Sequence, residues 1–345
     1  MTQLEAQAGE RQPGQAQPGE PQPGGLTLDA ARFFAARLAA SWVPGYLAGR
    51  GFGEQALRPW TVGYAPAGWR ALIAHLRDLG YGDAVIQAAG LARRTRRGVL
   101  VDFFRDRAMF GIRWPGGTLA GFTGRVRPGG TQPVYLNSRT TGLFRKGSLL
   151  FGLYEGRRAL AAGARPVLVE GPLDAIAVSM AGRYAGVSPC GTALTPAQVT
   201  LLARTSDLRR AGVVVAFDAD RAGRRAAVRA YHLLRGVTGH TVTLVLPAGQ
   251  DPAGFRREHG GRELARRLDA SVPLADLVVD EAVAPFERGL VFLDGKFAAL
   301  HAAAPLIAGL PSGQVARQVA RLAGRLGLNY AEVTEAVTGA LRPGE

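Results

Sequence analysis

Apolar and polar residues follow two different patterns before and after residue 165. From about residue 26 to 165, short apolar runs are separated by Gly and Pro, which is typical of a mixed α+β region with many turns. The first predicted element is a helix with Asp29 as its N-cap and Phe33, Phe34 and Leu38 along it. This part of the chain therefore predicts an α+β fold that begins near Leu26.

After residue 165, apolar segments of strand length alternate with helical patterns. Strands are predicted near 167–169, 186–187, 212–217 and 241–246, with helices near 174–180 and 222–234 and another that begins at Thr195 and Pro196. Strands that alternate with helices predict a parallel sheet with right-handed crossovers. From about 272 to 341 the pattern is mostly helical, with an amphipathic helix near 314–326.

These patterns divide the chain into four predicted segments. Residues 1–25 hold six Gln, five Gly and four Pro, and such a segment buries too little apolar surface to offset its ordering entropy. We expect a disordered tail at 1–25, a basic α+β subdomain at 26–165, a parallel-sheet α/β domain at 166–270 and a helical subdomain at 271–345.

Carboxylates follow three of the predicted strands. Glu170 comes directly after the strand at 167–169, and Asp174 four residues later. Asp218 and Asp220 follow the strand at 212–217, and Asp251 follows the strand at 241–246 after a short turn. Ligands of open parallel sheets bind outside the carboxyl ends of the strands. Neighbouring strands would therefore deliver five acids to one crevice.

Clustered carboxylates raise one another's pKa unless a cation neutralises them. Mg²⁺ or Mn²⁺ suits such oxygen ligands and can orient phosphates during an in-line displacement. Each acid also has an alternative interpretation: Asp174 as a helix N-cap, Asp218 and Asp220 as ordinary loop acids, and Asp251 with Pro252 as a turn. The joint pattern, repeated about 45 residues apart, favours a metal site.

The chain is basic, and its charge is uneven. It has 42 Lys and Arg against 27 Asp and Glu, a formal charge of +15, which indicates a polyanionic partner. Residues 91–165 alone contain 15 basic and three acidic residues, interleaved with aromatic ones. This composition predicts a groove for single-stranded nucleic acid. The alternative is a solvated basic face with the aromatic side chains in the core.

Several classes of protein are excluded by composition. The lone Cys190 rules out a disulfide framework and a four-cysteine zinc site, so we expect no zinc in this chain and a reducing, cytoplasmic location. We interpret Cys190 as a small packing residue, because no His is placed to activate it as a nucleophile. No run of about 18 apolar residues occurs, so we expect no contact with a membrane.

The acidic motifs at 170–174 and 218–223 resemble those of a TOPRIM domain, the metal-binding fold of bacterial primases, some topoisomerases and some nucleases. The flanking sequences narrow this resemblance to the catalytic core of bacterial DnaG-type primases, from about residue 28 to 340. They lie at 63–66, 104–110, 121–126, 135–138, 143–147 and 150–155.

The resemblance implies an enzyme that makes short RNA primers on single-stranded DNA from nucleoside triphosphates. Glu170, Asp218 and Asp220 would bind the catalytic metal, and Asp174 and Asp251 would complete the acidic site. A basic ridge would hold the template strand or the incoming nucleotide's phosphates. Its members would be Arg105, Arg107, Arg125, Asn137 and Lys146.

Two departures from the family pattern leave alternatives open. Val134 stands where the family usually has Lys, and Ala253 stands where it usually has a further Asp. We expect a polymerase core without zinc ribbon or helicase-interaction domain, served by a replicative helicase or a separate zinc-ribbon protein. The alternatives are a non-catalytic module that binds single strands and a TOPRIM nuclease.

Overall fold

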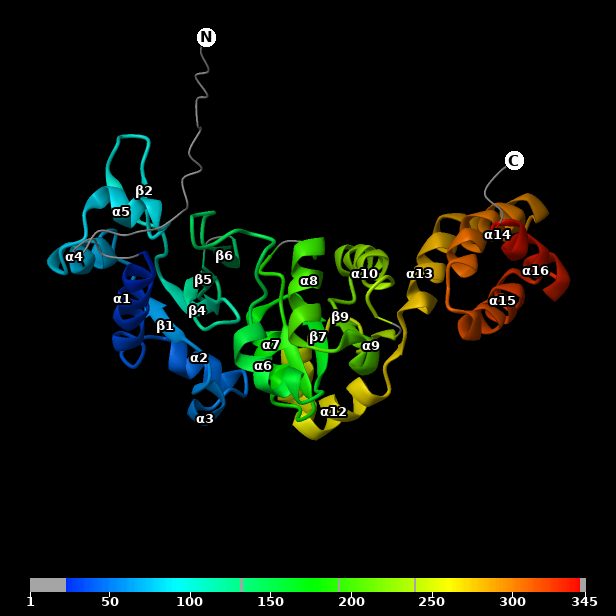
Figure 1. Ribbon diagram of the computed structural model, residues 1–345, viewed down its shortest axis with the longest axis horizontal. Coiled ribbons are helices and arrows are strands. Elements are labelled where there is room, and N and C mark those ends of the chain that lie inside the picture. The colour runs from blue at the N-terminus through cyan, green and yellow to red at the C-terminus, as the bar shows by residue number, and fades with distance from the viewer. Residues whose placement is uncertain (1–22, 131–132, 192, 239, 342–345) are drawn as a thin grey trace, which may run out of the picture.

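The computed structural model describes residues 23–130, 133–191, 193–238 and 240–341. Figure 1 shows three units in a row along the long axis. We name them the N-terminal unit (residues 23–152), the central unit (153–273) and the C-terminal unit (274–341). This order confirms the predicted fold class of an α+β region, a parallel-sheet domain and a helical region.

The N-terminal unit is built on a four-stranded antiparallel sheet of order β1-β4-β5-β6. The strands are β1 (Val62–Ala65), β4 (Arg107–Arg113), β5 (Leu119–Val126) and β6 (Tyr135–Asn137). A separate hairpin is formed by β2 (Ala92–Arg94) and β3 (Leu100–Asp102). The helices are α1 (Pro23–Ala36), α2 (Val43–Gly49), α3 (Glu54–Leu57), α4 (Ala71–Asp78) and α5 (Asp83–Ala88).

Helix α1 begins earlier than the sequence predicts. It starts at Pro23, so Asp29 lies within the helix and is not its N-cap. The Asp29 carboxylate instead accepts hydrogen bonds from the Tyr81 hydroxyl (2.8 Å) and from Arg32 (3.0 Å). The predicted cap was wrong because the Asp29 carboxylate binds Tyr81, 52 residues away in the chain. The local sequence pattern does not reveal this partner. Residues 1–22 of the predicted tail lie outside the described residues.

The central unit contains a five-stranded sheet of order β11-β10-β9-β7-β8. Strands β7 (Arg165–Val169), β8 (Tyr184–Val187), β9 (Val213–Ala216) and β10 (Thr241–Thr243) are parallel, and β11 (Val272–Pro273) is antiparallel to β10. The helices are α6 (Leu153–Ala161), α7 (Pro172–Ser179), α8 (Pro196–Thr205), α9 (Leu208–Ala211), α10 (Arg221–Leu234), α11 (Pro252–His259) and α12 (Gly261–Asp269).

Both faces of this sheet are covered, which explains the continuous apolar runs of its strands. In β9, Val213 and Val215 belong to one hydrophobic cluster, and Val214 and Ala216 to the other. The predicted start of α8 is confirmed, because Thr195 accepts the Gln198 N–H in a capping box. Helix α6 packs against β8 and α8. We therefore propose a unit boundary near residue 152 in place of the predicted 165.

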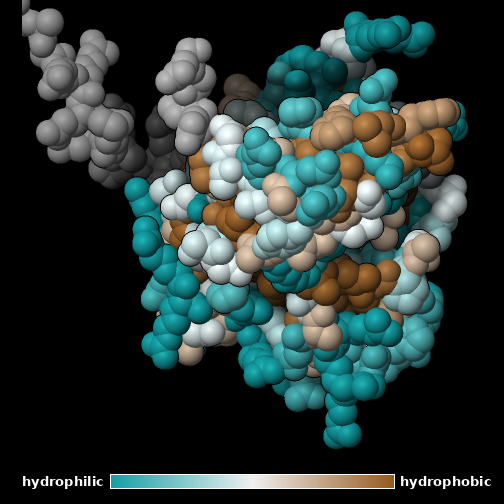
Figure 2. All heavy atoms as spheres, turned by 90° about the vertical axis from the view of Figure 1, so that its right-hand side faces the viewer, coloured by the Kyte–Doolittle hydropathy of each residue, from teal (hydrophilic) through white to brown (hydrophobic). Residues whose placement is uncertain are grey.

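The C-terminal unit is helical, as the sequence predicts. It contains α13 (Leu274–Val283), a 3-10 helix η1 (Ala284–Gly289), α14 (Leu293–Ala308), α15 (Ser312–Leu326) and α16 (Tyr330–Gly339). Figure 2 looks onto this unit and shows apolar patches between polar side chains. In the described part of the chain, no helix has the length and apolar content needed to cross a membrane.

Candidate acidic site and its arginine neighbours

The strand order of the central unit brings the predicted acids to one edge of the sheet. Strands β7, β9 and β10 are direct neighbours and parallel, so the segments after their carboxyl ends lie together. One contact shows how close they come: a carboxylate oxygen of Glu170 accepts the backbone N–H of Asp218 at 3.1 Å. We call this set the acidic edge. Its members are Glu170, Asp174, Asp218, Asp220 and Asp251.

Two acids of this edge also start helices. Asp220 is the N-cap of α10, and its Oδ1 accepts the Gly223 N–H at 2.7 Å. Asp251 is the N-cap of α11, and its Oδ1 accepts the Gly254 N–H. A Cβ at residue 223 would lie 2.0 Å from the Asp218 carbonyl oxygen, so only glycine fits there. Capping occupies one oxygen of each carboxylate and fixes the direction of the other.

The structure does not place Asp174 at a helix N-cap, which was the alternative interpretation of this residue. The N-cap of α7 is Gly171, and Asp174 lies in the first turn of the helix. Its side chain is buried and accepts the backbone N–H of Ala253 at 3.1 Å. This bond joins the start of α7 to the start of α11. Interpreting Asp174 as an N-cap is therefore wrong, because the carboxylate turns toward the neighbouring helix.

Two acids of the edge have raised pKa values. Burial first, and then the charges of Glu170, Asp251 and Asp220, raise the pKa of Asp218 to about 6. Burial and the Asp251 charge raise the pKa of Asp174 to about 7. A carboxylate cluster of this kind is stabilised by a cation that neutralises it. The donor set consists of oxygen atoms and fits a hard divalent ion such as Mg²⁺ or Mn²⁺.

The acidic edge is an incomplete cage. Across the described ranges, no three His, Cys, Asp or Glu side chains are arranged to hold one ion by themselves. Mg²⁺ is usually held by one or two carboxylates, while waters and substrate phosphates complete its shell. The residues present are therefore compatible with a metal that binds together with a phosphate-bearing substrate.

Aromatic and basic side chains from the N-terminal unit lie beside these acids. The Arg125 guanidinium lies 5.2 Å from the ring centre of Tyr46 and 5.3 Å from that of Tyr135. Tyr135 packs against Gly171, where a Cβ would lie 3.6 Å from the tyrosine hydroxyl. Arg50 reaches the acidic edge itself, with its Nη2 atom 3.5 Å from Oδ2 of Asp251.

Several buried polar atoms in this neighbourhood have no hydrogen-bond partner among the residues that the structure describes. They are the Tyr46 hydroxyl, Nε of Arg50, Nε of Arg125 and Oδ1 of Asn137. Buried polar groups normally have partners, so a group of unsatisfied ones indicates a missing ligand or water. Three of the four can donate hydrogen bonds, which suits an anion such as a phosphate.

The sequence analysis missed Tyr46 and Arg50. Both belong to the region of α2, far in sequence from Arg125 and from Asp251. Arg50 is the C-cap of that helix and has no local feature that marks it as part of a site. The Arg50 to Asp251 contact exists only because the N-terminal unit packs against the central unit.

The structure places the residues of the predicted basic ridge in different environments. Lys146 is exposed, as expected of a ligand-binding cation. Arg105 is stacked 3.4 Å over the ring of Trp69, which is 56% exposed. Asn137 donates a hydrogen bond to the Cys190 carbonyl oxygen at 2.7 Å and so joins β6 to the central unit.

Arg107 does not lie on the ridge, which corrects the sequence-based expectation. Its side chain is buried at 6% exposure. Its Nη1 atom donates to the carbonyl oxygens of Gly124 (3.0 Å), Pro133 (2.9 Å) and Val134 (3.2 Å). The guanidinium is thereby committed to the β5–β6 connection. We leave Arg107 out of the proposed binding surface.

Cys190 fits its interpretation as a packing residue. It is buried, and burial raises the pKa of its thiol to about 12, so it is not an activated nucleophile. Its φ of 60° is a conformation that non-glycine residues seldom adopt. The Cys190 carbonyl oxygen thereby accepts from Asn137, so the loop serves the contact between the two units.

Comparisons with known proteins agree with this fold. Residues 33–157 match the family model described as the N-terminal domain of the DNA primase catalytic core, and residues 167–255 match one described as Toprim-like. The chain is 34% identical over 306 residues to the DNA primase of Streptomyces coelicolor, which covers 87% of this chain and 47% of that protein. It is 32% identical over 317 residues to the DNA primase of Mycobacterium tuberculosis, covering 89% and 49%. The chain thus spans about half the length of the curated relatives it matches.

Solved structures with the same fold include three that are informative. A DNA primase domain from Pseudomonas aeruginosa matches with a TM-score of 0.74 and 31% identity, covering 92% of this chain and 99% of that one. The RNA polymerase domain of Mycobacterium tuberculosis primase DnaG in complex with double-stranded DNA matches with a TM-score of 0.73 and 30% identity, covering 89% and 98%. A DnaG primase catalytic domain bound to single-stranded DNA matches with a TM-score of 0.74 and 30% identity, covering 90% and 98%.

Proposed function

The chain belongs to the DnaG-type family of DNA primases, and we propose that it is a nucleotidyltransferase that synthesises short RNA primers on single-stranded DNA from nucleoside triphosphates. The observation that carries this proposal is the juxtaposition of the acidic edge with Arg50 and Arg125. Asp174 and Asp218, whose pKa values are raised by burial and by neighbouring carboxylates, lie beside buried N–H groups that lack a partner in the described structure. A metal and a triphosphate would neutralise the first and satisfy the second.

The acidic edge would hold the divalent metal. Glu170, Asp218 and Asp220 would be its ligands, with Asp174 and Asp251 completing the acidic site. When bound, Mg²⁺ or Mn²⁺ supplies electrostatic stabilisation of the phosphates during transfer. Asp220 and Asp251 already point one oxygen at a helix start, so their second oxygens are held in defined directions, and that of Asp251 faces Arg50. This preorganisation reduces the rearrangement that binding requires.

The chain's cations would hold the phosphates and the template. Arg125 and Arg50 would bind the incoming triphosphate, because their unsatisfied Nε groups lie next to the acidic edge. Arg105 on the exposed Trp69 ring offers a surface on which an unpaired template base can stack. The relative whose structure contains bound single-stranded DNA supports such a template. We further propose a replicative helicase or a zinc-ribbon protein as partner and, for a replication enzyme, a cytoplasmic location.

The decisive experiment is a primer-synthesis assay. The purified chain, single-stranded DNA, ribonucleoside triphosphates and Mg²⁺ or Mn²⁺ should yield short oligoribonucleotides. Asp218→Asn with Asp220→Asn should reduce the product at least about 10³-fold, since the metal loses its charged ligands. Asparagine also caps helices, so α10 should stay folded, which the melting temperature would verify.

Asp207→Asn provides the matched control. Asp207 caps α9 by accepting the N–H groups of Arg209 and Arg210, away from the acidic edge, and its replacement should leave synthesis intact. Strand binding without product under both metals would contradict the proposal and support a binding module. Shortened DNA would support a nuclease.

A further inference from the structure

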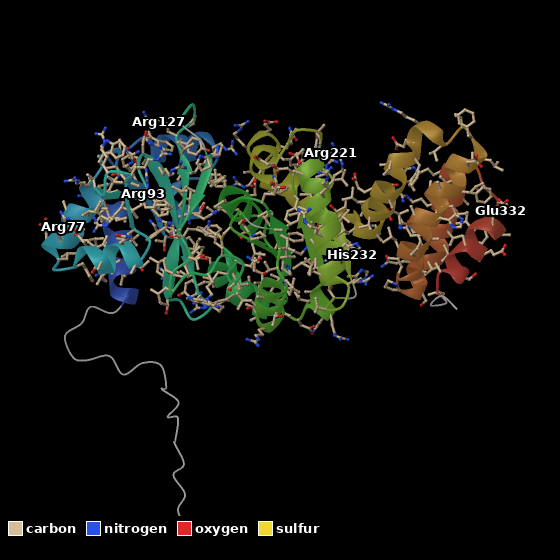
Figure 3. The ribbon with its side chains drawn as sticks, turned by 90° about the horizontal axis from the view of Figure 1, so that it is seen from above. Arg77, Arg93, Arg127, Arg221, His232 and Glu332 are labelled. Atoms are coloured by element: carbon tan, nitrogen blue, oxygen red, sulfur yellow. The ribbon has the colours of Figure 1, made fainter. Side chains whose placement is uncertain are left out.

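Helix α10 carries a row of arginines that the acidic edge does not use. Arg221, Arg225 and Arg229 are each four residues apart and all exposed, and His232 continues the row. Residues four apart share one helix face and lie about 6 Å from each other along the axis. Figure 3 labels Arg221 and His232 toward the two ends of this helix. We call these four residues the α10 stripe.

Within the described part of the chain, the residues of the α10 stripe form no ion pair. The ion pair that α10 does form among the described residues joins Arg224 to Glu281 of α13 at 2.8 Å, on another face of the helix. Helix α15 offers a contrast, because Arg317, Arg321 and Arg325 have the same spacing and each pairs with a carboxylate. Like charges four residues apart destabilise a helix when nothing offsets them. The stripe therefore points to an external anion.

The position of the stripe relates it to the acidic edge. Arg221 follows Asp220 directly, so the row starts at the candidate metal site and runs away from it for about 17 Å, at 1.5 Å per residue. Helix α8 packs alongside α10, in the upper part of the central unit in Figure 1. A polyanion that leaves the acidic edge over α10 would meet successive arginines.

The side chains around the stripe select a duplex over a single strand. Proteins that bind single strands usually provide aromatic rings on which bases stack. The aromatic residue of α10, Tyr231, is buried at 7% exposure, whereas Trp69 in the N-terminal unit is 56% exposed. Apart from His232 at its far end, the α10 stripe offers cations without rings, and such a surface contacts phosphates, which suits a helix whose bases are already stacked.

We propose that the α10 stripe binds the phosphate backbone of the RNA–DNA hybrid duplex as it leaves the acidic edge. That the duplex is primer on template rests on the proposed function. Binding of a hybrid duplex to the stripe is a separate property and requires no synthesis.

The test compares two double variants of the full chain. Arg225→Glu with Arg229→Glu removes the centre of the stripe. Arg58→Glu with Arg262→Glu makes the same change in charge at two exposed arginines near α3 and α12, which lie at the lower edge of the view in Figure 1. Binding of a preformed RNA–DNA hybrid and of single-stranded DNA of equal length is measured by fluorescence anisotropy over a series of salt concentrations.

The stripe variant should bind the hybrid at least about 10-fold more weakly than the control variant. The slope of log K against log salt should fall by about 2, since each lost phosphate contact contributes about 0.9. Single-stranded DNA should be affected no more than in the control. Arg225→Gln with Arg229→Gln should give the same change in slope, which excludes an effect of the introduced acids, and melting temperatures verify folding.

Two results would overturn the inference. If the slope of log K against log salt for hybrid binding is equal in the stripe and control variants, α10 makes no phosphate contact. An equal loss of hybrid and single-strand binding would assign the stripe to a single strand. Because the assay contains no nucleoside triphosphates, a failure of primer synthesis would not affect it. Intact synthesis with unchanged hybrid binding would reject this inference alone.

Discussion

Two regions of the molecule, the C-terminal unit and residues 91–165, use arginine in opposite ways. In the C-terminal unit, arginines of α15 pair with Asp276, Asp280 and Glu287, so the helix is joined to α13 and η1. Residues 271–345 contain six basic and eight acidic residues. Residues 91–165 contain 15 basic and three acidic ones, and their described part forms a single ion pair, Arg127 with Asp106.

This difference distinguishes charged residues that stabilise the fold from charged residues that remain available to bind a ligand. A paired arginine neutralises a carboxylate and covers apolar surface with its stem. An unpaired arginine attracts counterions, which a polyanion can displace with a gain in free energy. The total charge of +15 therefore says less about function than its distribution does. The three changes below test the comparison.

The largest effect is expected where a paired, half-buried acid has a buried partner. Asp276 accepts from Arg317 through both oxygens (2.7 and 2.6 Å) and from the fully buried Gln318. Asp276→Ala should lower the free energy of unfolding by about 2–3 kcal/mol, because Gln318 loses a partner inside the protein. Urea denaturation measures this loss, and binding of single-stranded DNA should be unchanged.

The dependence of the free energy of unfolding on pH gives a second test of the role of Asp276. Burial raises its pKa, but the hydrogen bonds from Arg317 and Gln318 outweigh burial and hold the pKa below its usual range. Its stabilising contribution should therefore be present at neutral pH and disappear as the pH falls through that lowered pKa. The exposed Asp294, at the start of α14, is the control. If Asp276→Ala lowers the free energy of unfolding no more than Asp294→Ala does, paired charges in the C-terminal unit do not stabilise the fold as the comparison requires.

A smaller effect is expected at Glu155, an acid of the basic region (residues 91–165) for which the described structure shows no ion pair with an arginine. Glu155 has a buried Oε1 without a partner in the described structure, although Arg113 and Arg157 are near. Burial raises the pKa of Glu155 to about 7 from 4.5. The folded state thus retains a proton that the unfolded state releases, and stability falls as the pH rises from about 4.5 to 7.

Glu155→Gln should therefore stabilise the protein at pH 8 by about 2 kcal/mol. This is less than the roughly 3.5 kcal/mol that a shift from 4.5 to about 7 corresponds to, at about 1.4 kcal/mol per pKa unit, because the buried glutamine amide also loses hydrogen bonds to water. Near pH 5 the gain should shrink toward zero, because the wild-type side chain is then largely protonated when folded. Melting temperatures of both proteins across this range would measure the effect. A gain independent of pH would argue against a raised pKa.

The smallest effect is expected at a free surface cation. The chain has two lysines, Lys146 in the basic region and Lys296 in α14. Lys146→Ala should weaken binding of single-stranded DNA a few-fold and reduce the salt slope by about 0.7, the value for one phosphate contact of a single strand. Lys296→Ala should change neither. Equal effects of the two variants would mean that only total charge matters.

Local patterns sufficed for much of the fold and for the acids. The strand–helix alternation after residue 165 and the cap at Thr195 depend on neighbours within a few residues, so the sequence displays them directly. The order of acids after β7, β9 and β10 was also predictable, since adjacent parallel strands end on one side of a sheet. Whether these acids bind the metal stays a prediction.

Contacts between distant segments were not predictable in this way. The sequence showed an arginine at 107 but not its burial, which depends on the carbonyl oxygens of Pro133 and Val134 across the β5–β6 connection. Asp29 resembled a helix cap until its Tyr81 partner was known. In both cases the deciding atoms lie more than 20 residues away in the chain.

By itself, the amino-acid sequence determined the secondary-structure periods, the fold class, the family and the strand-end carboxylates, because each depends on residue type and short spacing. Only the tertiary structure decided which cations are free. It buried Arg107, paired the arginines of α15, left those of the α10 stripe exposed and brought Arg50 to Asp251. The physical reason is that desolvation and charge pairing depend on distances in space, and the packing of whole units sets those distances.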